Sequence, residues 1–169
     1  MIVEKLVVGF MKTNCYIVYS PDDRGCAVID PGGESRRICA ELEKRGLTPD
    51  VILLTHAHAD HVRGLWHLYE KTGACVYVHA GELDARINIG PFRFVPPLKT
   101  QYVCEGGTIC AGSLRFSVLE CPGHTPGSVA YWCEDTLFTG DTLLHMGSGR
   151  VDYPCSSRED MIASLTRLR

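Results

Sequence analysis

Three histidines and an aspartate stand close together in the run that begins at Thr55. They are His56, His58, Asp60 and His61. In an extended segment alternate residues share a face, so His56 and His58 project to the same side and can hold one metal ion. Asp60 and His61 fall where the segment is expected to turn into a helix, so they point at a second position beside the first. No packing role explains so many imidazoles at the end of a buried strand. The spacing therefore predicts two adjacent metal sites.

Further ligands must come from other parts of the chain, because a zinc-like ion takes about four ligands and a catalytic ion keeps one position open for water. His124 follows an expected strand, in a loop rich in glycine and proline. Asp141 ends another expected strand. Each alone is as readily an ordinary loop residue, but beside the cluster both become ligand candidates. A carboxylate has two oxygens and can ligate two cations, so Asp141 is the natural bridge.

The other three histidines are expected to lie outside the metal sites. His67 falls within an expected helix and His79 at the end of an expected strand, which is typical of surface or hydrogen-bonded histidines. His145 lies four residues after Asp141 and can edge a substrate pocket. No other substrate-binding residue is identified.

The composition is that of an ordinary folded domain. With 169 residues, 45% of them hydrophobic and 22% charged, the chain is expected to form a single domain over residues 1–169. The net charge of −3 comes without a basic stripe, so we expect a small-molecule substrate and no nucleic acid partner. No apolar run approaches the roughly 18 residues of a membrane helix and no leader segment is evident, so no membrane partner is expected.

Nine cysteines are dispersed along the chain without a CxxC pair. This argues against a disulfide framework or a zinc ribbon. Most stand beside apolar residues in strand-like segments, where a reduced cysteine acts as a small buried hydrophobe. A reducing, cytoplasmic location is therefore expected.

The elements expected around these residues are mostly strands. We expect strands at 2–8, 14–19, 26–29, 51–54, 75–79, 108–110, 114–119, 129–133 and 136–139. We expect helices at 34–45, at 61–71 and at the C-terminal end, where Met161, Ile162, Leu165 and Leu168 mark one apolar face. Residues 88–101 hold three prolines and no periodicity, which predicts a long loop near the site. This order indicates an α/β fold in which outer helices cover two mixed sheets.

Taken together, the motifs resemble the metallo-β-lactamase superfamily, whose THxHxDH run is unbroken here from Thr55 to His61. The segment from Pro122 to Ser128 resembles the third-histidine loop of that family, and the segment from Thr139 to Leu143 resembles its bridging-aspartate loop. With residues 147–152, the latter segment is most similar to the glyoxalase II-like hydrolases. The resemblance extends over essentially the whole chain.

The resemblance implies a four-layer αββα sandwich with the ligands in a groove at the sheet edges. It assigns one ion to His56, His58, His124 and Asp141, and another ion to Asp60, His61 and Asp141. Family members supply one more histidine to the second ion from a strand beyond the terminal helix, but no histidine follows His145 here. We therefore expect the domain to be C-terminally incomplete, without the last strand and helix of the fold, and its second site to be one ligand short.

The resemblance also implies a reaction, the hydrolysis of a thioester of the hydroxyacylglutathione type. Two divalent ions, zinc in the first place and iron or manganese as alternatives, would activate the attacking water. Asp60 would act as the catalytic residue by orienting that water. One alternative is a persulfide dioxygenase with a single iron on His56, His124 and Asp141. Another is a shortened form that binds metal without catalysis.

Overall fold

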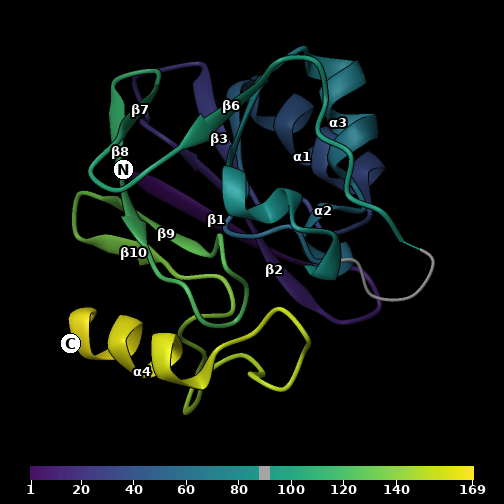
Figure 1. Ribbon diagram of the computed structural model, residues 1–169. Coiled ribbons are helices and arrows are strands. Elements are labelled where there is room, and N and C mark those ends of the chain that lie inside the picture. The colour runs from purple at the N-terminus through teal and green to yellow at the C-terminus, as the bar shows by residue number, and fades with distance from the viewer. Residues whose placement is uncertain (88–91) are drawn as a thin grey trace.

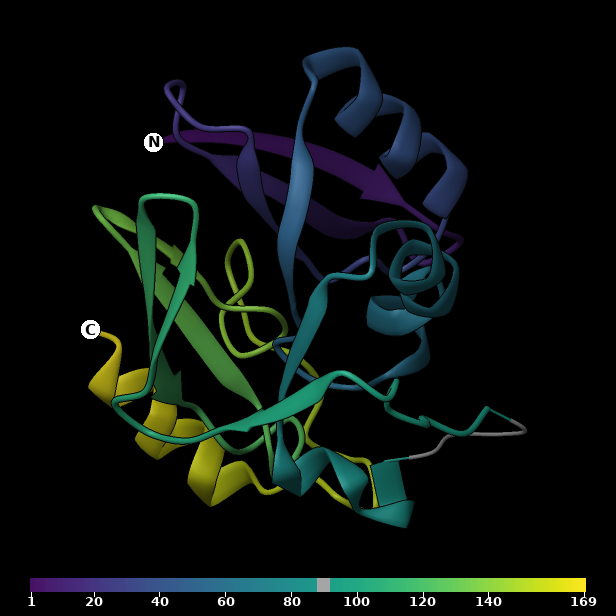
Figure 2. The same cartoon turned by 90° about the horizontal axis from the view of Figure 1, so that it is seen from above.

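Two β-sheets face each other in the computed structural model, which describes residues 1–87 and 92–169 (Figure 1; Figure 2). The first sheet runs in the order β1 (Ile2–Val8), β2 (Thr13–Tyr19), β3 (Gly25–Ile29), β4 (Thr48–Leu53), β5 (Cys75–His79) and β6 (Thr100–Val103). The second runs in the order β10 (Thr136–Phe138), β9 (Val129–Cys133), β8 (Leu114–Glu120) and β7 (Thr108–Ala111). The helices are α1 (Ser35–Arg45), α2 (Ala59–Val62), α3 (Leu65–Thr72) and α4 (Arg158–Arg167), with 3₁₀ turns η1 (Ala80–Leu83) and η2 (Ala85–Ile87).

The first sheet is mixed. Its strands β1 to β3 are antiparallel, whereas β3 to β6 run parallel to one another. Parallel strands end at the same edge of a sheet, so the segments that follow β3, β4 and β5 start side by side. The apolar strand expected at 51–54 forms the second half of β4 and the residue after it, and is buried on both faces. The edge where β3, β4 and β5 end is where the candidate site lies.

Helices α1 and α3 cover the outer face of the first sheet, as Figure 2 shows. Ile38 and Leu42 from α1 join Leu65 and Leu68 from α3 in one apolar core with the sheet. A second apolar core lies between the two sheets, where Phe116 and its neighbours meet residues of β3 and β4. Helix α4 lies beside the second sheet, and the Ser164 hydroxyl donates a hydrogen bond to the Pro122 carbonyl over 2.7 Å. The layers are therefore helix, sheet, sheet, helix, as expected.

The expectation of two sheets is confirmed, but the second sheet is antiparallel along all its described strands rather than mixed. The expected loop at 88–101 also needs correction. Residues 88–91 lie outside the described part of the chain, and the last residues of that segment begin β6, which pairs in parallel with β5. A four-residue strand without clear alternation is set by its neighbour in the sheet rather than by its own pattern.

One expected helix, at 61–71, is two. Helices α2 and α3 are separated because the chain turns there against the segment after β3: the Gly64 amide donates to the Pro31 carbonyl over 2.8 Å. Among the described residues, no helix is long and apolar enough to cross a bilayer.

Candidate metal centre

Four segments bring the six predicted ligands together at the edges of the two sheets. His56 and His58 lie in the extended segment after β4, and Asp60 and His61 lie in α2 directly behind it. His124 lies in the loop between β8 and β9, and Asp141 follows β10. Residues up to 85 positions apart thus meet in one place, as the sequence predicted.

The first group consists of three histidines. Ring nitrogens of His56, His58 and His124 lie within 4.8 Å of one another, and all three side chains are buried. His58 Nδ1 lies 2.8 Å from His124 Nε2. The Nε2 atoms of His56 and His58 are buried without a hydrogen-bond partner in the described part of the chain. Buried polar atoms are rarely left unpaired, so His56 Nε2 fits a metal ligand, whereas His58 faces the group through its other nitrogen, Nδ1.

The second group shares His56 with the first and adds His61 and Asp141. His61 Nε2 lies 3.3 Å from Asp141 Oδ1 and 3.5 Å from Asp60 Oδ2. The other carboxylate oxygen of Asp141, Oδ2, lies 3.4 Å from His124 Nε2. Each oxygen of Asp141 therefore faces a histidine of a different group, which is the geometry that a bridging carboxylate needs.

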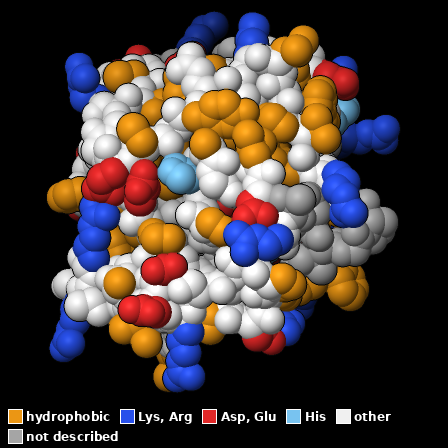
Figure 3. Space-filling view, viewed as in Figure 1, with side chains coloured by type: hydrophobic (Ala, Val, Ile, Leu, Met, Phe, Trp, Pro, Cys, Tyr) orange, Lys and Arg blue, Asp and Glu red, His pale blue; other side chains and the backbone are white. Residues whose placement is uncertain are grey.

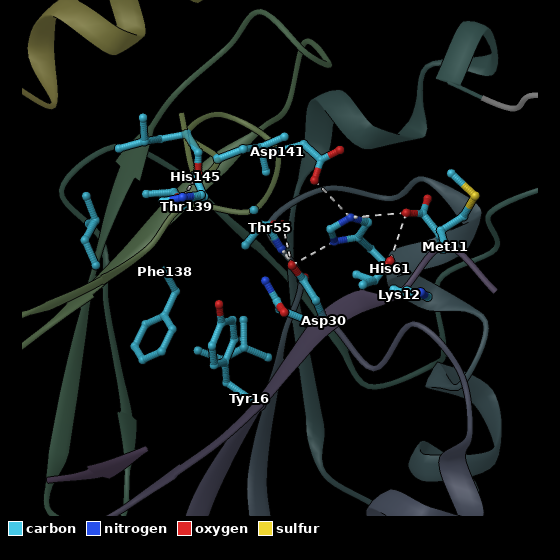
Figure 4. A pocket seen from close by; sticks show the side chains of 18 residues that line it. Met11, Lys12, Tyr16, Asp30, Thr55, His61, Phe138, Thr139, Asp141 and His145 are labelled. Carbon is cyan, nitrogen blue, oxygen red and sulfur yellow. Dashed lines mark hydrogen bonds and ion pairs between the residues drawn. The ribbon is translucent and has the colours of Figure 1, made fainter. Parts of the chain in front are cut away.

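Asp30 belongs to this centre and was not identified from the sequence. Its carboxylate accepts hydrogen bonds from the Thr55 amide over 2.8 Å and the Thr55 hydroxyl over 2.6 Å, and it lies 2.9 Å from His61 Nδ1. Figure 4 shows the His61 ring held between Asp30 on one side and Asp141 on the other. A partner on Nδ1 fixes the ring so that Nε2 faces the ligand position. Only the parallel pairing of β3 with β4, which the sequence does not show, brings Asp30 beside Thr55.

The protein environment drives the histidines to opposite charge states. Burial lowers the pKa of His56, and the neighbouring His61 lowers it further. Burial and the nearby His124 lower the pKa of His58 to about 4. Burial alone would lower the pKa of His61 too, but Asp30 and Asp141 outweigh it and raise that pKa to about 10. Without a metal, two neutral rings with free lone pairs therefore face a charged one.

Two hollows open on the centre, and both are lined by Asp60 and Asp141. One, of about 400 Å³, also touches His61, Tyr16 and Phe138. The other, of about 520 Å³, also touches His58 and His124, and its walls include Phe10, Ile87, Leu144, Tyr153, Arg63 and Arg150. The second hollow thus combines ligand-type side chains, an apolar rim and two cations.

The three remaining histidines lie outside both groups. His145 is exposed and lines the smaller hollow, but it belongs to neither ligand group. His79 is hydrogen-bonded as predicted, since its Nδ1 accepts from the Gly81 amide over 3.1 Å. His67 is half-buried on α3. All nine cysteines are free and five are buried, which fits the prediction of reduced, mostly apolar roles.

A histidine-rich centre at the edge of two facing sheets defines a metal-binding enzyme of the αββα class. The family model described as the metallo-beta-lactamase superfamily matches residues 8–169, and the chain belongs to this superfamily of metal-dependent hydrolases.

Curated relatives span most of the chain. The probable metallo-hydrolase YqgX of Bacillus subtilis is 36% identical, over 95% of this chain and 80% of the relative. The hydroxyacylglutathione hydrolase GloC of Haemophilus influenzae is 30% identical, over 98% of this chain and 82% of the relative.

Solved structures agree with the fold. The BLEG-1 B3 metallo-beta-lactamase aligns with a TM-score of 0.87 at 31% identity, over 98% of this chain and 84% of the other. ETHE1 from Myxococcus xanthus aligns with a TM-score of 0.85 at 31% identity, over 99% and 69%. TTHA1623 in a di-iron-bound form aligns with a TM-score of 0.83 at 34% identity, over 98% and 85%. The fold is therefore shared with proteins of several names, and the site must decide between activities.

Proposed function

We propose that this chain hydrolyses a thioester of the hydroxyacylglutathione type. The observation that carries the proposal is the convergence of His56, His58, His124, His61 and Asp141 in two overlapping ligand groups beside a hollow of about 520 Å³, which His58, Asp60, His124 and Asp141 line. A cavity of this size accepts a small molecule. The choice of substrate is supported by the name of the relative GloC, a hydroxyacylglutathione hydrolase.

The proposal includes two divalent ions, with zinc in the first place and iron or manganese as alternatives. His56, His58, His124 and Asp141 would hold the first ion, and Asp60, His61 and Asp141 the second. Such ions lower the pKa of bound water toward about 7 and polarise a substrate carbonyl. Imidazole and carboxylate ligands suit zinc, iron and manganese to different degrees, and the di-iron form of TTHA1623 supports iron as the main alternative.

Asp60 is the proposed catalytic residue. Its Oδ2 accepts a hydrogen bond from the Thr13 hydroxyl over 3.0 Å, which fixes the orientation of the carboxylate. The side chain is 33% exposed and lines both hollows, so it reaches the space that a substrate would enter. A carboxylate in this place can accept a hydrogen bond from the attacking water and aim it at the carbonyl carbon.

The larger hollow fits a small anionic thioester. Phe10, Leu144 and Tyr153 offer apolar contacts, and Arg63 forms no ion pair with another described residue. Arg150 is already paired with Asp152, over 2.7 Å. On the face in Figure 3, acidic and basic side chains are scattered rather than gathered in one basic field, so a nucleic acid is not part of the proposal. The free cysteines support a reducing location such as the cytoplasm.

The test is a steady-state assay with purified protein loaded with zinc, iron or manganese. A hydroxyacyl thioester of glutathione is expected to be hydrolysed, with release of a free thiol that a thiol reagent detects. Asp141→Asn, which keeps the shape of the side chain and removes its charge, is expected to be inactive. Wild-type protein that binds metal and hydrolyses no thioester would contradict the proposal and favour metal binding without catalysis.

The dioxygenase alternative also has an observation in its favour. The single iron would take His56, His124 and Asp141: His56 and His124 belong to one group of close ring nitrogens, and His124 Nε2 lies 3.4 Å from Asp141 Oδ2. Two histidines and a carboxylate are the usual ligands of non-haem iron in oxygenases. One iron per chain, with oxygen uptake on glutathione persulfide, would favour this activity over hydrolysis.

A further inference from the structure

Glu82 is a buried carboxylate that no ligand group uses. It lies in η1, just after β5, and its residue is 1% exposed. Its carboxylate accepts hydrogen bonds from the Ala57 amide over 2.5 Å, from the Thr125 hydroxyl over 2.6 Å and from the Gly127 amide over 3.0 Å. Burying a carboxylate costs free energy unless hydrogen bonds compensate for it. These three bonds offset that cost, and the loops they join indicate what the residue does.

The partners of Glu82 stand beside the ligands of the first group. Ala57 lies between His56 and His58, and Thr125 follows His124. Oxygen Oε2 takes the bond from Ala57, while Oε1 takes the bonds from Thr125 and Gly127. Each carboxylate oxygen thus accepts hydrogen bonds from one loop only, Oε2 from the loop of His56 and His58 and Oε1 from the loop of His124. A single side chain therefore joins two loops that extend from different sheets.

The space around this link leaves little room for movement. A Cβ atom added to Gly127 would lie 2.8 Å from Glu82 Oε1, so the His124 loop approaches the carboxylate as closely as a glycine permits. The Thr125 hydroxyl also lies 2.6 Å from the Ser128 hydroxyl, which braces it within its own loop. The distance between the two loops is therefore set by the length of one carboxylate.

We propose that Glu82 is a positioning residue that sets the spacing of His58 and His124, and thereby the affinity of the first metal position. Between these rings the separation of His58 Nδ1 from His124 Nε2 is 2.8 Å. Outer hydrogen bonds that orient ligands typically change metal affinity by about 10-fold to 100-fold when lost. This inference rests on the metal centre of the proposed function.

Glu82→Gln is the sharpest variant, because it keeps the size of the side chain. A carboxamide has one acceptor oxygen and one NH₂ group. If the NH₂ group faces Ala57, it meets a backbone N–H; if it faces the other loop, it meets the N–H of Gly127. In either orientation one backbone amide loses its acceptor, while the Thr125 hydroxyl can turn to accept from the NH₂ group, so the link between the two loops is weakened without a cavity.

Zinc affinity is measured by competition with a chromophoric chelator in two backgrounds. Asp60→Ala removes a ligand of the second position and leaves the first; His58→Ala does the reverse. Glu82→Gln is expected to weaken zinc binding about 10-fold to 100-fold in the first background and to leave it unchanged in the second. The visible spectrum of the cobalt(II)-loaded first position is expected to change as well, which a general loss of stability would not cause.

Two controls keep the outcome clear. Val118→Ala trims the core between the sheets, away from both loops, and is expected to lower thermal stability without changing zinc affinity or the cobalt spectrum. Thr125→Val removes the hydroxyl that donates to Glu82 and contacts Ser128, and is a milder form of the test should Glu82→Gln fold poorly. Loss of thermal stability in both Glu82→Gln and Thr125→Val, with unchanged zinc affinity, would overturn the inference.

The two proposals fail differently. If the unmodified chain and the two background variants bind no zinc-class ion, the metal centre itself is wrong. If they bind it and Glu82→Gln binds equally well in the first background, only the role of Glu82 is wrong.

Discussion

His61 carries a proton that a metal ion must displace. Asp30 and Asp141 overcome the effect of burial and raise its pKa from 6.5 to about 10. A histidine whose pKa is raised by folding adds stability that is complete below pH 6.5 and is lost as the pH rises through about 10. Metal binding at this position should therefore release a proton at neutral pH.

The first prediction compares metal-free wild-type protein with His61→Asn by urea unfolding at several pH values. The advantage of the wild type in unfolding free energy is expected to shrink by on the order of 2 kcal/mol between pH 6.5 and ~8.5, since one pKa unit corresponds to about 1.4 kcal/mol. Both proteins carry the same nine cysteines, so the ionisation of thiols contributes equally to both and cancels in the difference. A difference that stays constant with pH would show that His61 is neutral.

Arg63 is the residue that we expect to recognise the charge of the substrate. Arg63→Ala is predicted to raise KM for an anionic thioester about 10-fold with little change in kcat. The lost ion pair would stabilise the bound substrate and the transition state equally. The matched control is Arg115→Ala, an exposed arginine on β8 that lines neither hollow. An equal effect on an uncharged thioester would exclude charge recognition.

At the scale of elements, the sequence predicted what is local and missed what depends on neighbours. The role of the run from His56 to His61 can be predicted because its ligands share one segment. The roles of Asp30 and Glu82 cannot, because their partners lie 25 to 45 positions away in the sequence and only the order of the strands brings them together. For the same reason, the sequence predicts no strand at β6, whose first two residues fall at the end of the expected loop: its pairing with β5 comes from the fold.

Helix α4 holds the His124 loop from outside, and Gly123 is where they touch. Gly123 has a φ of +141°, and a Cβ atom there would lie 2.5 Å from the backbone of Met161. Gly123→Ala is predicted to lower the free energy of unfolding by about 2 to 4 kcal/mol, from backbone strain plus the clash. Gly46→Ala is the matched control, since Gly46 has a φ of +65° with nothing within 4 Å, and should cost only about 1 kcal/mol. Similar losses in urea unfolding would contradict a specific contact with α4.

At the scale of the whole molecule, the centre joins the ends of both sheets. An ion held there binds the folded chain more tightly than the unfolded one, so it should stabilise the fold by up to about 4 kcal/mol at 1,000 times its Kd. Chelation is therefore predicted to lower Tm, and added zinc to restore it, in thermal unfolding scans. His58→Ala, which removes one ligand, should show a smaller zinc-dependent shift. A Tm that does not respond to zinc would argue against binding at the sheet edges.

The link through Glu82 also has a consequence for solvent access. Loop amides usually exchange their hydrogens with water quickly, because loops open at little cost. The amides of Ala57 and Gly127 are instead bonded to a buried carboxylate. We expect both to exchange as slowly as amides in the middle of the sheets, even in metal-free protein, when followed by deuterium uptake. Fast uptake at both amides would show that the loops open freely. Slow uptake would show that the loops hold the ligand side chains in their binding positions in the absence of metal.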